Sequence, residues 1–248
     1  MVMDHSDAID VPYFKGKIEF KNVWFAYVGE DWILKDVSFK VKAKENVAFV
    51  GATGSGKTTI LSLIVRNYDI QKGQIFIDGL DIKKYQIASL RKHIGQMLQD
   101  VFLFSGTVES NITLRSEEIT SDIVKEACRF VNADKVIDKL PNKYNEIVRE
   151  RGKNFSSGER QLISFARVVS HKPNIMILDE ATSNIDTETE ALIQDSLKKM
   201  MNIGTMLIVA HRLSTIQHCD KIIVLKKGKI IESGTHLELL DKRGHYYN

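Results

Sequence analysis

The feature that most constrains this chain is a glycine-rich turn at residues 51–58, with the sequence GATGSGKT. The turn fits the pattern G-x-x-x-x-G-K-[ST]. It directly follows a continuous apolar run at residues 47–50 (VAFV), which is typical of a strand buried on both faces. An apolar helix is predicted from residue 57 to about residue 66. Strand, turn and helix in this order predict a phosphate-binding loop, because glycines let consecutive backbone N–H groups converge on phosphate oxygens at the positive end of a helix.

The turn and the first helical residues are the predicted ligands of a nucleotide. Lys57 is expected to reach its β- and γ-phosphates, and the Thr58 hydroxyl is expected to bind Mg²⁺. The strand and helix on either side disfavour the alternative, a glycine-rich turn with an incidental lysine. The remaining phosphate contacts are predicted for Gly51, Thr53, Gly54, Ser55, Gly56 and Thr59.

A second apolar strand, at residues 175–178 (IMIL), ends in two adjacent carboxylates, Asp179 and Glu180. Open α/β sheets bind ligands at the carboxyl ends of their strands. Asp179 is expected to hold Mg²⁺ there, and Glu180 to polarise an attacking water. Alone, a strand ending in Asp-Glu is most often a solvated terminus. Beside a phosphate-binding loop, the catalytic interpretation is favoured.

A third motif resembles the signature sequence of a known protein family. The segment at residues 155–161 (FSSGERQ), about twenty residues before Asp179, resembles the LSGGQ signature of ATP-binding cassette (ABC) ATPases. The resemblance covers residues 17 to 248 and implies an ATPase that uses ATP and Mg²⁺. It also implies further site residues, each with a structural alternative: Tyr27 for adenine stacking, Gln99 for Mg²⁺ or the attacking water, the D-loop at residues 183–186 with Asp186, and the switch histidine His211.

In this family, the signature of one cassette faces the ATP held by a second cassette, which assigns Ser156 and Gly158 to that contact. Ser156 and Glu159 also form an S-x-x-E capping box, which needs no ligand. The signature departs from the family pattern at Phe155, at Glu159 and, most importantly, at Ser157, where the family has glycine. A side chain there opposes close backbone approach, so a non-identical partner cassette is expected. The alternative is a homodimer that tolerates Ser157.

The expected fold is α/β: a P-loop NTPase (RecA-like) core with an N-terminal antiparallel β subdomain and a helical subdomain inserted before the signature. Alternating residues from residue 18 and again at residues 34–41 predict the antiparallel strands. From about 103 to 171 the helical period dominates, and strands alternate with helices again after Pro173. The expected ATPase domain is 16–248.

Residues 98–104 (LQDVFLF) and 150–152 (ERG) resemble the exporter branch of the family, in which membrane helices precede the cassette on the same polypeptide. Residues 1–15 are therefore expected to be the leader from an upstream transmembrane domain, with the cassette at the cytoplasmic face of a membrane. A separately encoded cassette is the alternative.

Composition and sequence pattern disfavour nucleic-acid binding, a membrane span and two alternative functions. A net charge of +3 is too small to indicate nucleic-acid binding, and no apolar run approaches the ~20 residues of a membrane span. A soluble ABC ATPase acting on DNA or ribosomes is disfavoured, because the helical region is compact rather than a long coiled coil. A regulatory module without turnover is disfavoured by Glu180 and His211.

Overall fold

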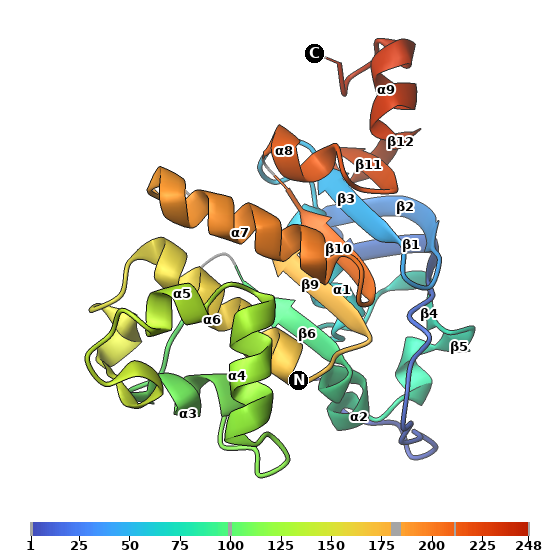
Figure 1. The fold of residues 1–248 in the computed structure, drawn as a ribbon. Helices are drawn as coiled ribbons and strands as arrows, with labels where there is room; N and C mark the ends of the chain where they lie inside the picture. The colour runs from blue at the N-terminus through green and yellow to red at the C-terminus, as the bar shows by residue number, and fades with distance from the viewer. Residues whose placement is uncertain (1, 99–100, 180–184, 211, 248) are drawn as a thin grey trace. The chain divides into compact units, whose positions relative to one another are not determined.

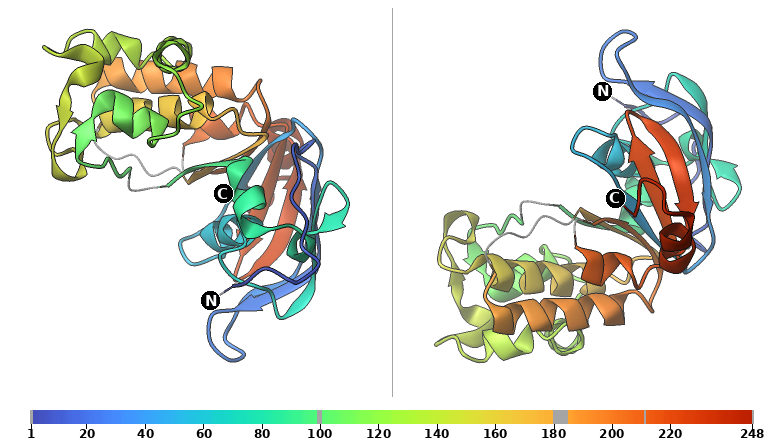
Figure 2. Two further views of the ribbon diagram at one scale, coloured as in Figure 1. Left: turned by 90° about the horizontal axis from the view of Figure 1, so that it is seen from below. Right: turned by 90° about the horizontal axis from the view of Figure 1, so that it is seen from above.

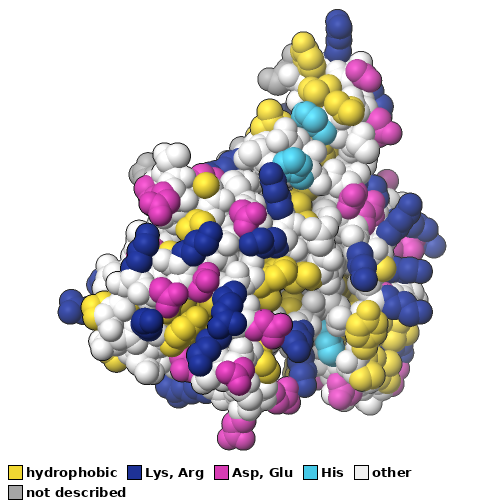
Figure 3. Space-filling view, in the orientation of Figure 1, with side chains coloured by type: hydrophobic (Ala, Val, Ile, Leu, Met, Phe, Trp, Pro, Cys, Tyr) yellow, Lys and Arg dark blue, Asp and Glu magenta, His cyan; other side chains and the backbone are white. Residues whose placement is uncertain are grey.

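The computed structural model describes residues 2–98, 101–179, 185–210 and 212–247 (Figure 1). They divide into two compact units, which are described separately. Unit 1 comprises Met1–Ile94, Asn174–Asp179 and Gly204–Asn248, and unit 2 comprises Gly95–Pro173 and Glu180–Ile203. Among the described residues, no helix combines the length and apolar character that crossing a bilayer requires. On the face shown in Figure 3, acidic and basic side chains are interspersed.

Unit 1 contains an antiparallel sheet with the strand order β2-β1-β4-β5. Phe20 on the central strand pairs with Phe39 on one side and Ile75 on the other, and alternate residues of this strand are buried. This sheet is the antiparallel subdomain that the alternating pattern predicts. Its strands are β1 (Ile18–Ala26), β2 (Trp32–Val41), β4 (Lys72–Ile77) and β5 (Leu80–Asp81).

A second, mixed sheet forms the α/β core of unit 1, where its strand order is β12-β11-β3-β10-β9. Adjacent strands from β11 to β9 are parallel, and β12 closes the edge as an antiparallel hairpin with β11. Because β3 and β10 have neighbours on both sides, they are apolar after their first residues, Asn46 and Thr205. These strands are β3 (Asn46–Val50), β9 (Ile175–Asp179), β10 (Thr205–Val209), β11 (Lys221–Lys226) and β12 (Lys229–Gly234).

One hydrophobic core joins the two sheets of unit 1. Phe20 and Phe39 stack at 4.5 Å between ring centroids, and Phe39 meets Phe49 of β3 edge-on at 5.5 Å. Helix α1 (Lys57–Ile64) follows β3 and buries Ile60 in the same core. Unit 1 is completed by η1 (Ile82–Lys84), α2 (Ile87–Lys92), α8 (Leu213–Ile216) and α9 (His236–Lys242), the last capped by Thr235.

The N-terminal residues lie against unit 1. The Ile9 carbonyl accepts a hydrogen bond from the Gln86 N–H at 2.9 Å, and the Val11 N–H donates to Ser89 Oγ at 3.0 Å. Phe14 is 1% exposed and packs edge-on against Tyr85, with 5.0 Å between ring centroids. Hydrogen bonds and a buried aromatic ring thus fix a segment that composition alone marks as a polar leader.

Unit 2 is mainly helical, and α6 lies at its centre, packed against α3, α4 and α7. Helices α6 and α7 run side by side in both views of Figure 2. Thr120 caps α4, accepting a hydrogen bond from the Ile123 N–H. Strand β6 (Ile94–Met97) leads into the unit. Its other elements are β7 (Gly106–Thr107), α3 (Val108–Thr113), α4 (Ser121–Phe130), α5 (Asp134–Ile137), η2 (Lys143–Asn145), β8 (Ile147–Val148), η3 (Glu150–Gly152), α6 (Ser157–Ser170) and α7 (Thr187–Met200).

Candidate nucleotide-binding site

The glycine-rich turn lies where β3 ends and α1 begins, and two of its glycines have no room for a side chain. A Cβ on Gly51, at φ +147°, would lie 2.2 Å from the Leu225 carbonyl oxygen. A Cβ on Gly56, at φ +104°, would lie 2.6 Å from Leu34 Cδ2. Both glycines are therefore required for the turn to pack against β11 and β2.

Lys57 is 6% exposed and folds back into the turn. Its Nζ donates hydrogen bonds to the carbonyl oxygens of Gly51, at 2.7 Å, and Ala52, at 3.0 Å. Burial lowers the pKa of Lys57, and the negative charge of Asp179 partly opposes that shift. The turn thus holds a cation among backbone carbonyls, where an incoming phosphate can take over its hydrogen bonds.

The Thr58 hydroxyl donates a 2.9 Å hydrogen bond to Asp179 Oδ2. A hydroxyl and a carboxylate are the hard oxygen ligands that Mg²⁺ prefers, and at nucleotide sites Mg²⁺ takes its other ligands from water and phosphate. The described residues contain no cluster of three or more His, Cys, Asp or Glu side chains suited to a metal. The Thr58 hydroxyl and the Asp179 carboxylate fit Mg²⁺ bound together with a nucleotide, whose phosphates would supply further oxygen ligands.

Ser55 carries a buried polar atom that also fits a ligand. Its Oγ has no hydrogen-bond partner among the described residues, and it lies 2.9 Å from the position of a Cβ on Gly51. A buried hydroxyl without a partner is costly, and a bound phosphate would supply an acceptor.

Tyr27 follows β1 directly, and its side chain reaches the first turn of α1. The phenol oxygen lies 3.1 Å from Thr59 Oγ1. The tyrosine is 51% exposed, which leaves part of its ring free for a ligand. Two of its neighbours carry no sequence signal: the Tyr68 ring, which contacts it, and Gln71, which binds the preceding residue, Ala26. Neither belongs to a local motif.

The signature segment lies in unit 2, where the predicted capping box is present at the start of α6. The Glu159 N–H donates to Ser156 Oγ at 3.2 Å, and the Ser156 N–H donates to the Glu159 carboxylate at 2.7 Å. A Cβ on Gly158 would lie 2.3 Å from Thr189 Cγ2. Gly158 therefore lets α6 approach α7, a packing role that the sequence pattern did not indicate.

Asp186 caps α7, accepting a 2.9 Å hydrogen bond from the Thr189 N–H. This bond lowers the pKa of Asp186. Five of the predicted site residues lie outside the described residues: Gln99, Glu180, Ser183, Asn184 and His211.

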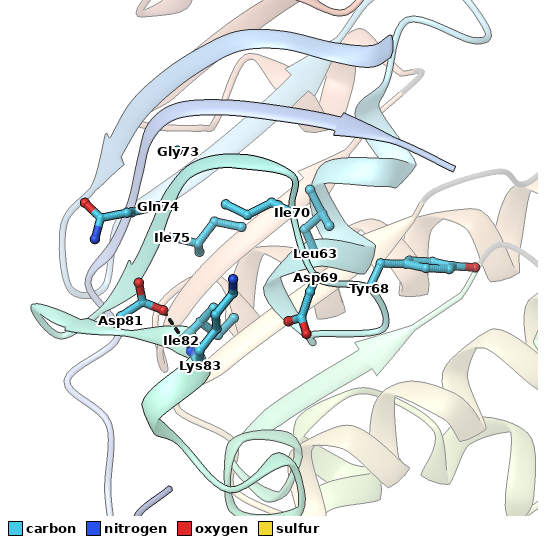
Figure 4. A pocket seen from close by; sticks show the side chains of 10 residues that line it. All are labelled: Leu63, Tyr68, Asp69, Ile70, Gly73, Gln74, Ile75, Asp81, Ile82 and Lys83. Carbon is cyan, nitrogen blue, oxygen red and sulfur yellow. Dashed lines mark hydrogen bonds between the residues drawn. The ribbon is translucent and has the colours of Figure 1, made fainter. Parts of the chain in front are cut away.

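A cavity of about 20 Å³ lies elsewhere in unit 1, below the loop that follows α1 (Figure 4). The Asp81 carboxylate at its edge accepts a 2.9 Å hydrogen bond from the Lys83 N–H. This volume has room for roughly one water molecule, so the cavity does not compete with the glycine-rich turn as a nucleotide site.

Comparison with known proteins gives matches along nearly the whole chain. The family model for ABC transporters matches residues 34–183. Among curated proteins, the probable multidrug resistance ABC transporter ATP-binding/permease protein YheH of Bacillus subtilis is 50% identical over 232 residues, which are 94% of this chain and 34% of that protein. The ATP-dependent lipid A-core flippase of Syntrophus aciditrophicus is 44% identical over 246 residues, which are 99% of this chain and 41% of that protein.

Among solved structures, a bacterial Atm1-family ABC exporter with ATP bound matches with a TM-score of 0.88 at 38% identity, covering 98% of this chain and 44% of that one. This match confirms the predicted fold, an ABC ATPase α/β fold with an antiparallel β subdomain. The chain spans about a third to two fifths of the curated relatives described. The chain belongs to the ABC transporter family, as an ATP-binding domain and ATPase of the exporter type.

Proposed function

We propose that this chain binds and hydrolyses Mg-ATP as one of two cassettes that enclose nucleotide between them, and that hydrolysis drives export through a membrane domain. The observation that carries the proposal is the placement of Lys57, Thr58 and Asp179. It puts a cation and two oxygen ligands around one glycine-rich turn. This is the arrangement that holds the β- and γ-phosphates and Mg²⁺ in phosphate-binding-loop enzymes.

In this proposal the geometry supports the roles of Lys57, Thr58 and Asp179, and the family resemblance supplies the others. Lys57 meets the β- and γ-phosphates, and Thr58 and Asp179, joined by Gln99, hold Mg²⁺. When bound, Mg²⁺ neutralises charge that develops on the transferred phosphoryl group. Tyr27 stacks on the adenine. The other phosphate ligands of the turn are Gly51, Thr53, Gly54, Ser55, Gly56 and Thr59.

The hydrolytic roles belong to Glu180, which orients and deprotonates the attacking water, and His211, which donates a hydrogen bond to the γ-phosphate. Ser156, Gly158 and Asp186 face the nucleotide held by the opposite cassette. The capped start of α6 supports this role for Ser156 and Gly158, because the N-terminus of a helix attracts phosphate.

The membrane domain and the location are inferred from the relatives. YheH carries both ATP-binding and permease in its name, and this chain spans only 34% of it. We therefore place a transmembrane domain upstream on the same polypeptide and the cassette at the cytoplasmic face of the membrane. Nucleic acid is not a partner in this proposal, consistent with a net charge of only +3.

The partner cassette in this proposal is similar but not identical. Ser157 is the first residue of α6 and stands where the family signature has glycine. Paired with itself, the chain would present this altered signature at both nucleotide sites. A partner with the consensus signature would complete one competent site, while Ser157 would serve a second, slower one.

Glu180→Gln tests hydrolysis. The substitution keeps the size of the side chain and removes the general base, so ATP affinity should persist while phosphate release nearly stops. Lys57→Ala, which should lose affinity instead, is the contrasting variant. Phosphate release by Glu180→Gln within a few-fold of the unmodified protein would remove Glu180 from this role.

The partner is tested with the full-length transporter purified alone, compared with its Ser157→Gly variant. We expect the glycine variant to hydrolyse ATP faster than the unmodified homodimer. If the unmodified homodimer hydrolyses ATP at both sites as fast as the glycine variant and transports substrate, Ser157 is tolerated and the transporter is a homodimer.

A further inference from the structure

Two residues of the same unit, Thr59 and Phe25, contact the Tyr27 side chain. Its hydroxyl oxygen lies 3.1 Å from Thr59 Oγ1 in the first turn of α1. Phe25, which is 2% exposed, meets the Tyr27 ring edge-on with 4.9 Å between centroids and 85° between planes. Tyr27 nevertheless stays 51% exposed, so part of its side chain remains accessible for stacking.

Tyr68 contacts the same ring. The two tyrosine rings are edge-on, with 5.1 Å between centroids and 83° between planes. In Figure 4 the Tyr68 ring projects away from the small cavity that its loop lines. The loop itself is anchored, because the guanidinium of Arg66, a fully buried residue, binds the Asp69 carboxylate at 3.0 Å. This ion pair spans Tyr68 and restricts its backbone.

Gln71, in the same loop, binds the backbone just before Tyr27. The Ala26 N–H donates to Gln71 Oε1 at 3.1 Å, and Gln71 Nε2 donates to the Ala26 carbonyl at 2.9 Å. Both backbone groups of one residue are therefore paired with one amide side chain. The loop at residues 66–71 thus fixes Tyr27 twice, through its ring and through the residue that precedes it.

We infer that Tyr68 and Gln71 are positioning residues for the nucleobase: they hold the Tyr27 ring in place before ATP arrives. This inference rests on the proposed function, in which Tyr27 stacks on adenine. A ring that is already ordered loses less conformational freedom when the base stacks on it, so affinity rises without any new contact to ATP. The effect concerns the base alone, because neither residue belongs to the phosphate-binding turn.

The test compares two ligands, Mg-ATP and Mg-bound inorganic triphosphate, which has the phosphates but no base. Tyr68→Leu should raise the Kd of ATP about three- to tenfold, as expected for the loss of an edge-on aromatic contact, and leave the Kd of triphosphate unchanged. Tyr68→Phe keeps the ring and should retain the ATP affinity.

Gln71→Glu removes the N–H donor to the Ala26 carbonyl and should also weaken binding of ATP but not of triphosphate. Gln74→Glu is the matched control. Gln74 is exposed on the neighbouring strand, β4, and its substitution introduces the same negative charge. This control should bind both ligands as the unmodified chain does. If Gln71→Glu and Gln74→Glu weaken ATP binding equally, the effect is one of charge and the role of Gln71 is overturned.

Tyr27→Leu separates this inference from the proposed function. If Tyr27→Leu weakens ATP binding and Tyr68→Leu does not, the positioning role fails while the base site stands. If Tyr68→Leu weakens ATP and triphosphate by the same factor, its effect is on the fold and the positioning role also fails. If Tyr27→Leu leaves ATP affinity unchanged, the base does not stack on Tyr27, and both the base assignment and this inference are overturned.

Discussion

The Thr58 hydroxyl, at the start of α1, donates a 2.9 Å hydrogen bond to Asp179 Oδ2, at the end of β9, across 121 residues of sequence. The mixed sheet explains the contact. Strand β10 pairs in parallel with both β3 and β9, so the chain following β3 and the last residue of β9 meet at one edge. Two oxygen ligands are thereby joined before any metal binds.

Asp179→Asn should abolish most of the gain in ATP affinity that Mg²⁺ provides. The amide keeps the shape of the side chain and loses the charge that attracts the metal. We expect the ratio of Kd values without and with Mg²⁺ to fall at least about tenfold, while metal-free ATP binds nearly as before. Thr58→Ser, which keeps the hydroxyl, serves as the control. An unchanged ratio for Asp179→Asn would rule out this carboxylate as a magnesium ligand.

Lys57→Ala should weaken nucleotide binding itself, with or without Mg²⁺. The substitution deletes a charge that contacts phosphate in the ground state as well as in the transition state. Hydrogen bonds to charged groups contribute about 1.5–3 kcal/mol, so the Kd of ATP should rise at least about tenfold. The measurement is a titration at equilibrium with no turnover. The phosphate-binding assignment does not survive an unchanged Kd.

Features that depend on neighbouring residues could be predicted from the sequence. The turn between β3 and α1 and the capping box at Ser156 each require residues within a few positions of one another. Apolar runs likewise predicted the strands, because burial on both faces of a sheet leaves no polar position.

Contacts between residues far apart in the chain leave no such local pattern in the sequence. Gln71 binds Ala26, and Gly158 packs against Thr189, but an isolated glutamine or threonine carries no signal of its partner. The burial of Phe14 was hidden for the same reason, since its neighbours in sequence are polar or exposed while Tyr85 and His93 cover its ring. Tertiary packing determines these positions.

Gly158→Ala should destabilise unit 2 by about 1–3 kcal/mol, as overpacking does, because the new Cβ would lie 2.3 Å from Thr189 Cγ2. Thr189→Ser removes that methyl group, so the double variant should recover much of the loss. Ser157→Gly, one position earlier, should change stability by less than about 1 kcal/mol. Urea unfolding measures all three. Equal stability of Gly158→Ala and the unmodified chain would show that α6 and α7 can separate at no cost.

Phe14→Ala should cost about 3–5 kcal/mol in the free energy of unfolding, because it empties a site between Tyr85 and His93. Tyr13→Ala is the adjacent control, since Tyr13 is 60% exposed while Phe14 is 1% exposed. The control should stay within about 0.5 kcal/mol of the unmodified chain. If both variants unfold at the same urea concentration, the N-terminal segment does not contribute to the core of unit 1.

Cys128 should make the protein less stable as the pH rises above about 8.5, the ordinary pKa of a thiol in an unfolded chain. The Cys128 residue is fully buried in α4, and this burial raises the pKa of its thiol to about 12. The native state therefore holds the proton more tightly than the unfolded state. The stabilisation is complete below pH 8.5 and is lost as the pH rises towards the native pKa. By pH 10, before tyrosines in the unfolded chain titrate fully, the free energy of unfolding should fall by about 1–2 kcal/mol.

The measurement uses the Cys219→Ala background, which leaves Cys128 as the single thiol of the chain. Urea unfolding at several pH values from 7 to 10 should show this loss, and adding Cys128→Ala should remove it. In the same background a maleimide should label the native protein at pH 8 only as fast as it unfolds, because the thiol is both protonated and inaccessible. Rapid labelling of the native state, or identical pH profiles with and without Cys128, would show that this thiol is not held protonated by the packing of α4.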